Sequence, residues 1–156
     1  MGKTKGRRRG PAVVRAGARG LVAAMAMTGT RTVTAAVGPH EKSPPEAIVD
    51  EHAPRQIREL SSRHREALTE LAHWGYGTAG GVAFGLLPRR FRGHVAAGPL
   101  YGLALWLTFE LAIAPALGVA HARRHQALWR AVIAGDHVLY GVMVAGRLAP
   151  EPRTRP

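Results

Sequence analysis

The stretch His73–Leu87, which reads HWGYGTAGGVAFGLL, decides the fold that we expect. Gly77, Gly81 and Gly85 recur every four residues, so on an α-helix they lie one above another on a single face. His73 continues this column by one more turn. Each glycine costs a helix in water roughly 1 kcal/mol relative to alanine, whereas in lipid a groove without side chains lets a second helix approach closely. We therefore predict that this segment spans a membrane and that other helices pack along it.

The composition agrees with one domain whose charges are segregated. The chain has 156 residues, no cysteine and a net charge of +12, from 22 Lys and Arg against 10 Asp and Glu. The absence of cysteine excludes a disulfide framework and a thiolate metal site. Seven of the 22 basic residues lie within residues 1–19, and the apolar runs hold almost none. This segregation favours a membrane protein over a uniformly basic nucleic-acid binder, although the hydrophobic fraction of 46% is ordinary for a soluble protein.

The apolar runs predict an all-α fold, a transmembrane bundle of four helices. We expect a basic cytoplasmic tail at residues 1–19, a membrane domain at 20–148 and a second tail at 149–156. The predicted spans are about 20–37, 71–87, 95–120 and 131–148, with an outer helical linker at 44–70. The first span is short and contains Arg31. A cleaved signal peptide is the alternative for this segment, and Arg31 argues against it.

The basic residues of the loops predict the orientation. With the N-terminus inside, the cytoplasmic pieces hold 13 Lys and Arg, and the outer pieces hold eight. The excess of Lys and Arg on one side favours a multi-pass protein of the bacterial inner (plasma) membrane with both termini in the cytoplasm. We also expect the N-terminal tail to contact anionic lipid.

An internal repeat divides the predicted bundle into two halves. The motif His-x-x-Tyr-Gly begins at His73 and again at His137, 64 residues later. A column of small residues follows each motif, and Gly141 begins the second column. Gly98 and Gly102 form another G-x-x-x-G pair in the third span. The second and fourth spans are therefore predicted to be equivalent parts of a two-plus-two repeat.

These features together resemble the YagU-like family of bacterial inner-membrane proteins, whose domain has no assigned function. The resemblance rests on the basic N-terminal tail, the small-residue first span, Pro44-Pro45, the HWGYG and HVLYG segments, and a G-x-x-x-G span ending in PALG at Pro115–Gly118. It covers about residues 20–146. It implies a small polytopic membrane protein without an assigned reaction, and it carries over no catalytic residues.

Four ionisable residues within or near the predicted spans form a candidate polar cluster, Arg31, His73, Glu110 and His137, and Asp136 adjoins the last of them. At about 1.5 Å per residue, all four are expected in the outer half of a core ~30 Å thick. A charge in hydrocarbon is normally paired or turned into the bundle. We therefore expect an Arg31–Glu110 ion pair flanked by the two histidines.

The cluster has a structural and a functional interpretation. A polar network that fixes helix register is favoured, and a proton or ion pathway is the alternative. Haem ligation by two histidines is much less favoured. His121 and His125 are four residues apart but flanked by arginines, so we expect them to be solvated. No metal site, cofactor or catalytic residue is predicted.

Three functions follow from these patterns. The favoured one is an integral inner-membrane protein that is not an enzyme and whose partner is the lipid bilayer. The second is a small transporter or an ion-conducting subunit that uses the polar cluster, as a homo-oligomer built through the glycine grooves. The third is a soluble basic helical protein that binds nucleic acid. An enzyme has the least support, because no nucleophile–base set can be recognised in the sequence.

Overall fold

The computed structural model describes residues 10–37, 44–117 and 127–146, and every regular element in these ranges is a helix. The predicted all-α fold is confirmed for this part of the chain. The predicted tail at 149–156, His121 and His125 lie outside the described residues. In chain order, the elements are α1 (Gly10–Val37), α2 (Pro44–His52), α3 (Arg55–Arg58), α4 (Ser62–Leu86), α5 (Arg89–Arg92), α6 (Ala97–Thr108), the π-helix η1 (Phe109–Ile113), α7 (Ala114–Leu117) and α8 (Ala127–Val144).

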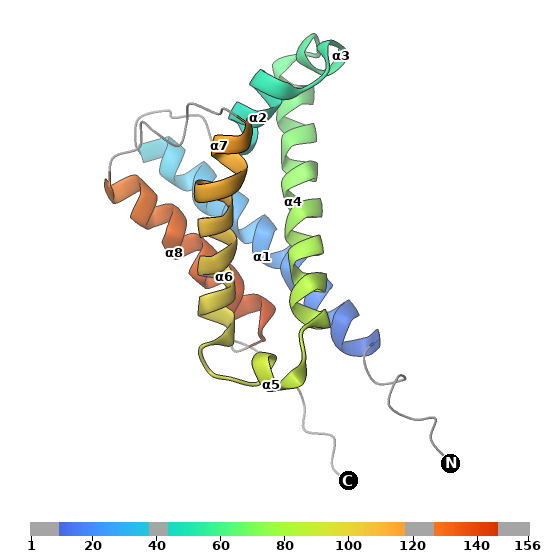
Figure 1. The fold of residues 1–156 in the computed structure, drawn as a ribbon. Coiled ribbons are helices and arrows are strands. Elements are labelled where there is room, and N and C mark those ends of the chain that lie inside the picture. Colours follow the sequence, from blue (N-terminus) through green and yellow to red (C-terminus); the bar gives the residue numbers. More distant parts are fainter. Residues whose placement is uncertain (1–9, 38–43, 118–126, 147–156) are drawn as a thin grey trace.

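Four long rods make up the structure: α1, α4, the continuous run α6–η1–α7, and α8 (Figure 1). α1 packs most extensively against α4, and α6 against α8. Contacts between α1 and α8 join the two pairs. The short helix α5 lies at one end of the rods, together with the start of α1 and the end of α8. α2 and α3 lie at the opposite end, beside the start of α4.

α1 begins ten residues earlier than the predicted first span. Residues 10–19 were expected to form a tail, but they are helical from Gly10 onward. Ala16 is buried in this part of α1, and its carbonyl group lies against Gly81 of α4. Small residues therefore continue the contact with α4 beyond the apolar run. Basic residues lie between them, so the hydropathy of the sequence did not indicate that the helix extends this far.

The segment predicted as a linker contains helices, but they do not run unbroken into the second predicted span. α3 begins directly after Pro54, and the chain then leaves the helix at Glu59. Ser61 has an extended backbone and precedes a new helix, α4, which starts at Ser62. α4 is consequently 25 residues long and begins nine residues before the predicted span.

Pro115 changes the helix type of the third rod. The sequence predicts a kink there, because proline has no N–H group and its ring clashes with the carbonyl oxygen four residues earlier. In the structure α6 widens into the π-helical turn η1 just before α7, which contains Pro115. A wider turn relieves that crowding, and π-helical turns of this kind are frequent at functional sites. Glu110 lies in this turn.

The interior is built from small residues, and the large aliphatic side chains lie on the outside. The buried hydrophobic residues are mostly small: Ala16, Ala23, Ala24, Phe84, Ala114, Tyr140 and Val144. The exposed ones include Val22, Leu71, Leu86, Leu100, Leu111 and Leu139. This arrangement is the reverse of the usual one in soluble proteins.

Within the described residues, one helix is long and apolar enough to cross a membrane, at Ala97–Ala116. Only 22% of its apolar window is buried inside the chain. α1 and α4 are longer, but each contains charged residues among its apolar ones.

Candidate functional site

The glycine column of α4 packs against α1. A Cβ atom added at Gly77 would lie 2.5 Å from the Cβ of Ala24. One added at Gly81 would overlap the carbonyl oxygen of Ala16, and Gly85 lies against the start of α1. These positions have no room for a side chain, because the two backbones touch there.

The second glycine contact joins α6 and α8. A Cβ atom added at Gly98 would lie 2.6 Å from the carbonyl oxygen of Gly141, and one added at Gly102 would overlap the carbonyl oxygen of His137. The columns of α4 and α8 therefore do not face each other, since each faces the other helix of its own pair. All six predicted packing glycines are used within the chain, so a homo-oligomer would need another surface.

Tyrosines connect the second helix pair to α4. The hydroxyl groups of Tyr140 and Tyr101 donate to the carbonyl oxygens of Gly77 and Gly80, respectively. Tyr140 is buried, whereas Tyr76, its counterpart in the repeat, is exposed. In both His-x-x-Tyr-Gly motifs the glycine contacts the other helix of its own pair, but the two tyrosines have different environments.

Arg31 forms its ion pair with Glu70, and the predicted Arg31–Glu110 pair is wrong. The Nη2 atom of Arg31 lies 2.8 Å and 3.0 Å from the two carboxylate oxygens of Glu70. Glu70 precedes the predicted span by one residue, so hydropathy placed it outside the bundle. The register of the antiparallel helix contact explains the pair, because Ala24 of α1 meets Gly77 of α4. Arg31 lies seven residues after Ala24, and Glu70 lies seven residues before Gly77, so the two side chains meet.

Two further side chains of this site were missed from the sequence, Thr28 and Trp74. The hydroxyl group of Thr28 donates to the Glu70 carboxylate. It accepts hydrogen bonds from Trp74 Nε1 at 3.1 Å and from Arg31 Nη2 at 3.3 Å. Nδ1 of His73 lies 3.9 Å from the same carboxylate. The first helix pair is therefore joined by one polar network centred on Glu70.

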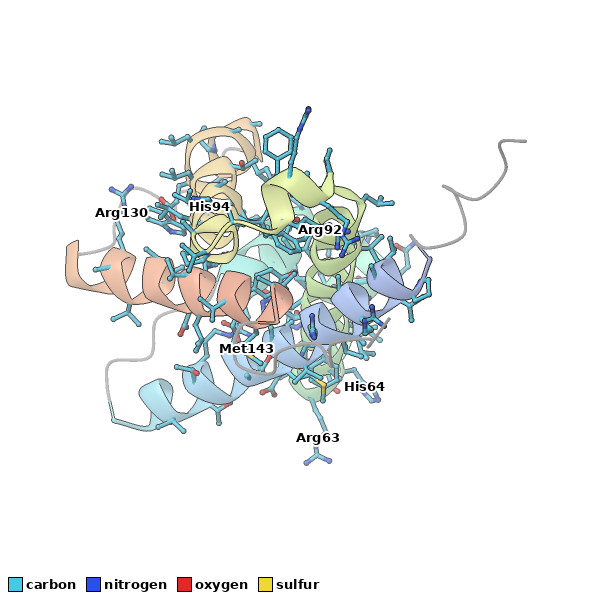
Figure 2. The ribbon with its side chains drawn as sticks, turned by 90° about the horizontal axis from the view of Figure 1, so that it is seen from below. Arg63, His64, Arg92, His94, Arg130 and Met143 are labelled. Atoms are coloured by element: carbon cyan, nitrogen blue, oxygen red, sulfur yellow. The ribbon has the colours of Figure 1, made fainter. Side chains whose placement is uncertain are left out.

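Glu110 pairs with Arg130, which lies one residue before the predicted fourth span. The Nη2 atom of Arg130 lies 3.4 Å from Oε2 of Glu110. The Glu110 side chain is only 5% exposed, so its charge is balanced mainly by this guanidinium group. Figure 2 shows Arg130 near the start of α8, on the side of α6. The register again explains the pair, because Gly102 meets the carbonyl group of His137. Glu110 lies eight residues after Gly102 on the third rod, and Arg130 lies seven residues before His137 on α8.

The two histidines occupy equivalent places in the two halves. Each lies four residues before the glycine that contacts the other helix of its pair, Gly77 for His73 and Gly141 for His137. Nδ1 of His137 lies 2.9 Å from the carbonyl oxygen of Ile133. A proton on Nδ1 that is donated to this carbonyl group leaves Nε2 as the basic nitrogen of the neutral ring. His137 is thus held in an orientation in which Nε2 can accept a proton.

We call the six residues of the two ion pairs and the two histidines the polar layer: Arg31, Glu70, His73, Glu110, Arg130 and His137. Each helix pair contributes one ion pair and one histidine. In the first pair the arginine is on the earlier helix and the glutamate on the later one, and in the second pair this order is reversed. His73 and His137 lie within electrostatic range of each other. His137 is about 10 Å along α8 from the end at Val144.

The polar layer does not gather metal ligands. Across the described residues, no three side chains of His, Asp and Glu come together to hold an ion. The site therefore consists of partly buried charges and two imidazole rings between helices. Such a set can fix the helix register, or it can accept and release protons.

The fold and the site define a class: an all-α protein of two helix pairs, each with a glycine contact and an interhelical ion pair. Comparisons with family models, with curated proteins and with solved structures find no match for this chain.

Proposed function

We propose that the protein is an integral membrane protein whose four rods span the bacterial inner membrane. The observation that carries this proposal is the reversed distribution of side-chain sizes. Leu111 is 70% and Leu100 is 62% exposed, while Gly77, Gly81, Gly98 and Gly102 are buried. In water, exposure of apolar surface costs about 25 cal/mol per Å². In hydrocarbon this cost disappears, and helices associate through small residues and interhelical hydrogen bonds.

The exposed threonines support the same proposal. Thr30, Thr32 and Thr108 donate their hydroxyl groups to the carbonyl oxygens four residues earlier, at 3.2, 3.0 and 2.7 Å. Their hydroxyl groups are thus satisfied without water, as a lipid-facing position requires.

The charges support an orientation with α5 in the cytoplasm. α5 carries Arg89, Arg90 and Arg92, and Arg15 and Arg19 lie near the start of α1 at the same end, whereas α3 and the start of α4 carry Arg55, Arg58, Arg63 and Arg65 at the other end. Counted over the whole sequence, the pieces predicted to be cytoplasmic hold 13 Lys and Arg against eight in the outer pieces, so the positive-inside rule favours a cytoplasmic location for α5, the start of α1 and the end of α8. The resemblance to the YagU-like family implies the same class of protein.

Within this proposal, the polar layer is a structural network and the protein is not an enzyme. Each ion pair lies between the two helices of one pair, beyond their glycine contact. A shift of one helix along the other would separate both charges, so each ion pair opposes sliding of the helices.

Membrane extraction tests the proposal. We expect the full-length protein to stay in the membrane pellet after washes with high salt and with alkaline carbonate, and to enter solution only with detergent. A basic protein held by charge, including a nucleic-acid binder, leaves the pellet in salt because salt screens its contacts. Recovery of the protein in the salt or carbonate supernatant would contradict the proposal.

A second candidate function is a proton or ion pathway through the polar layer. Two imidazole rings within electrostatic range of each other and of two carboxylates favour it. The Glu110→Gln variant is expected to reduce dye-reported proton flux in proteoliposomes at least tenfold, whereas Glu59→Gln, at an exposed position, leaves it unchanged. If the wild-type protein shows no flux above empty liposomes, this candidate is rejected.

A further inference from the structure

We propose that the segment of residues 86–95, which surrounds α5, binds the headgroup of an anionic phospholipid. The inference builds on the proposed membrane location and adds a specific ligand class at a specific place. It concerns a site apart from the N-terminal tail and from the polar layer. Figure 1 shows α5 in the connection between α4 and α6, at the end of the bundle.

The segment has a concentrated positive charge with no acidic residue nearby in sequence. Arg89, Arg90 and Arg92 lie within four positions, and the chain contains no Asp or Glu between Glu70 and Glu110. The described acidic residues of α2 and of the start of α4 lie at the opposite end of the rods, as does Glu59, which follows α3 (Figure 1). The arginines of α5 are therefore not neutralised by these carboxylates, and their charge is complementary to an anionic headgroup.

Two of the three guanidinium groups are held by the segment itself. The Cζ atom of Arg90 lies 4.8 Å from the centre of the Phe91 ring, which is a cation–π contact. Nε of Arg92 donates to the carbonyl oxygen of Leu87 at 2.9 Å, so this side chain folds back toward the end of α4. Figure 2 shows Arg92 beside the end of α4 at this face of the molecule. The remaining N–H groups of Arg92 form a fork that matches a phosphate group.

Exposed apolar residues beside these arginines indicate that the ligand carries acyl chains. Phe91 is 54% and Val95 is 71% exposed, and Leu86 is also exposed. A free phosphate or a nucleic acid would leave these side chains in water. A phospholipid covers both kinds of surface, because its phosphate meets the arginines while its glycerol and upper acyl region meet the apolar side chains.

Lipid-dependent stability of the full-length protein in detergent tests the inference. Phosphatidylglycerol is titrated into the purified, delipidated protein in dodecyl maltoside, and the unfolding temperature is recorded, with phosphatidylcholine and inorganic phosphate as parallel titrants. We expect phosphatidylglycerol alone to raise the unfolding temperature, since a ligand of the folded state stabilises it. The rise should shrink at high salt.

Matched variants locate the site. Replacing Arg89, Arg90 and Arg92 together with glutamine is expected to weaken the apparent phosphatidylglycerol affinity roughly 100-fold. Replacing Arg55, Arg58 and Arg63 with glutamine removes the same charge at the other end and should leave the affinity unchanged. The Phe91→Ser variant should weaken the affinity while all three arginines remain. Size-exclusion elution equal to that of wild type shows that each variant is folded.

Three outcomes overturn the inference: equal stabilisation by phosphatidylcholine, equal stabilisation by inorganic phosphate, or unchanged affinity in the α5 triple variant. If the triple variant does not fold, the Phe91→Ser variant and the two parallel titrants decide. Failure here is distinguishable from failure of the proposed function, because carbonate extraction reports the membrane location independently of lipid type.

Discussion

The Gly81→Ala variant is expected to lose roughly 1–3 kcal/mol of unfolding free energy, whereas Gly75→Ala in the same helix loses none. A Cβ atom at Gly81 would lie 2.9 Å from the carbonyl carbon of Ala16 and overlap its oxygen, so α1 and α4 would have to separate. At Gly75 no atom lies within 4 Å of an added Cβ. The two changes are chemically identical, so any difference in helix propensity is small and only the contact with α1 differs.

Unfolding of both variants in one detergent, followed by circular dichroism, checks this prediction. Gly102→Ala and Gly135→Ala repeat the comparison for the second helix pair, because Gly102 meets the carbonyl group of His137 and Gly135 has open space. Equal stabilities of Gly81→Ala and Gly75→Ala would show that α1 does not rest on the α4 glycine column.

The Arg31→Met variant is expected to destabilise the protein by about 3 kcal/mol, the lower end of the range for removing one partner of a buried pair. The two side chains are 22% and 24% exposed, and methionine leaves the Glu70 carboxylate without its guanidinium partner. Adding Glu70→Gln removes that carboxylate charge, so the double variant should recover most of the loss.

The exposed Arg55–Glu59 pair provides the control for this experiment. Its side chains are 83% and 60% exposed, so Arg55→Met should change stability by less than ~0.5 kcal/mol. The same unfolding measurement is used for all three variants. A loss in Arg31→Met no larger than in Arg55→Met would mean that the Arg31–Glu70 pair is solvated and does not hold α1 against α4.

The helices and the contact positions could be predicted from the sequence, because helical periodicity acts over short distances. A four-residue column of glycines shows that a backbone approaches at Gly77, Gly81 and Gly85. It does not show which helix approaches, since a groove without side chains accepts any small-residue partner. The sequence therefore predicted the packing glycines but not the pairing of α4 with α1.

The ion pairs could not be predicted for a related reason. Hydropathy assigned Glu70 and Arg130 to segments outside the predicted spans, although both lie in helices that continue past the apolar runs. Arg31 and Glu110 were consequently paired with each other, although Asp136 also lies within the fourth predicted span. Once Ala24 is known to meet Gly77, the antiparallel register identifies Glu70, so the missing information was one helix contact.

The surroundings of the rods can be measured directly with single cysteines, because the chain has none of its own. Leu111 is 70% exposed on the third rod, and Ser62 is exposed at the start of α4. In permeabilised cells, a charged maleimide should modify the Ser62→Cys variant and leave Leu111→Cys unmodified until detergent denatures the protein, since a thiol in lipid forms no thiolate. Modification of Leu111→Cys at the rate of Ser62→Cys would show that water surrounds the third rod, and this would contradict the membrane-spanning bundle.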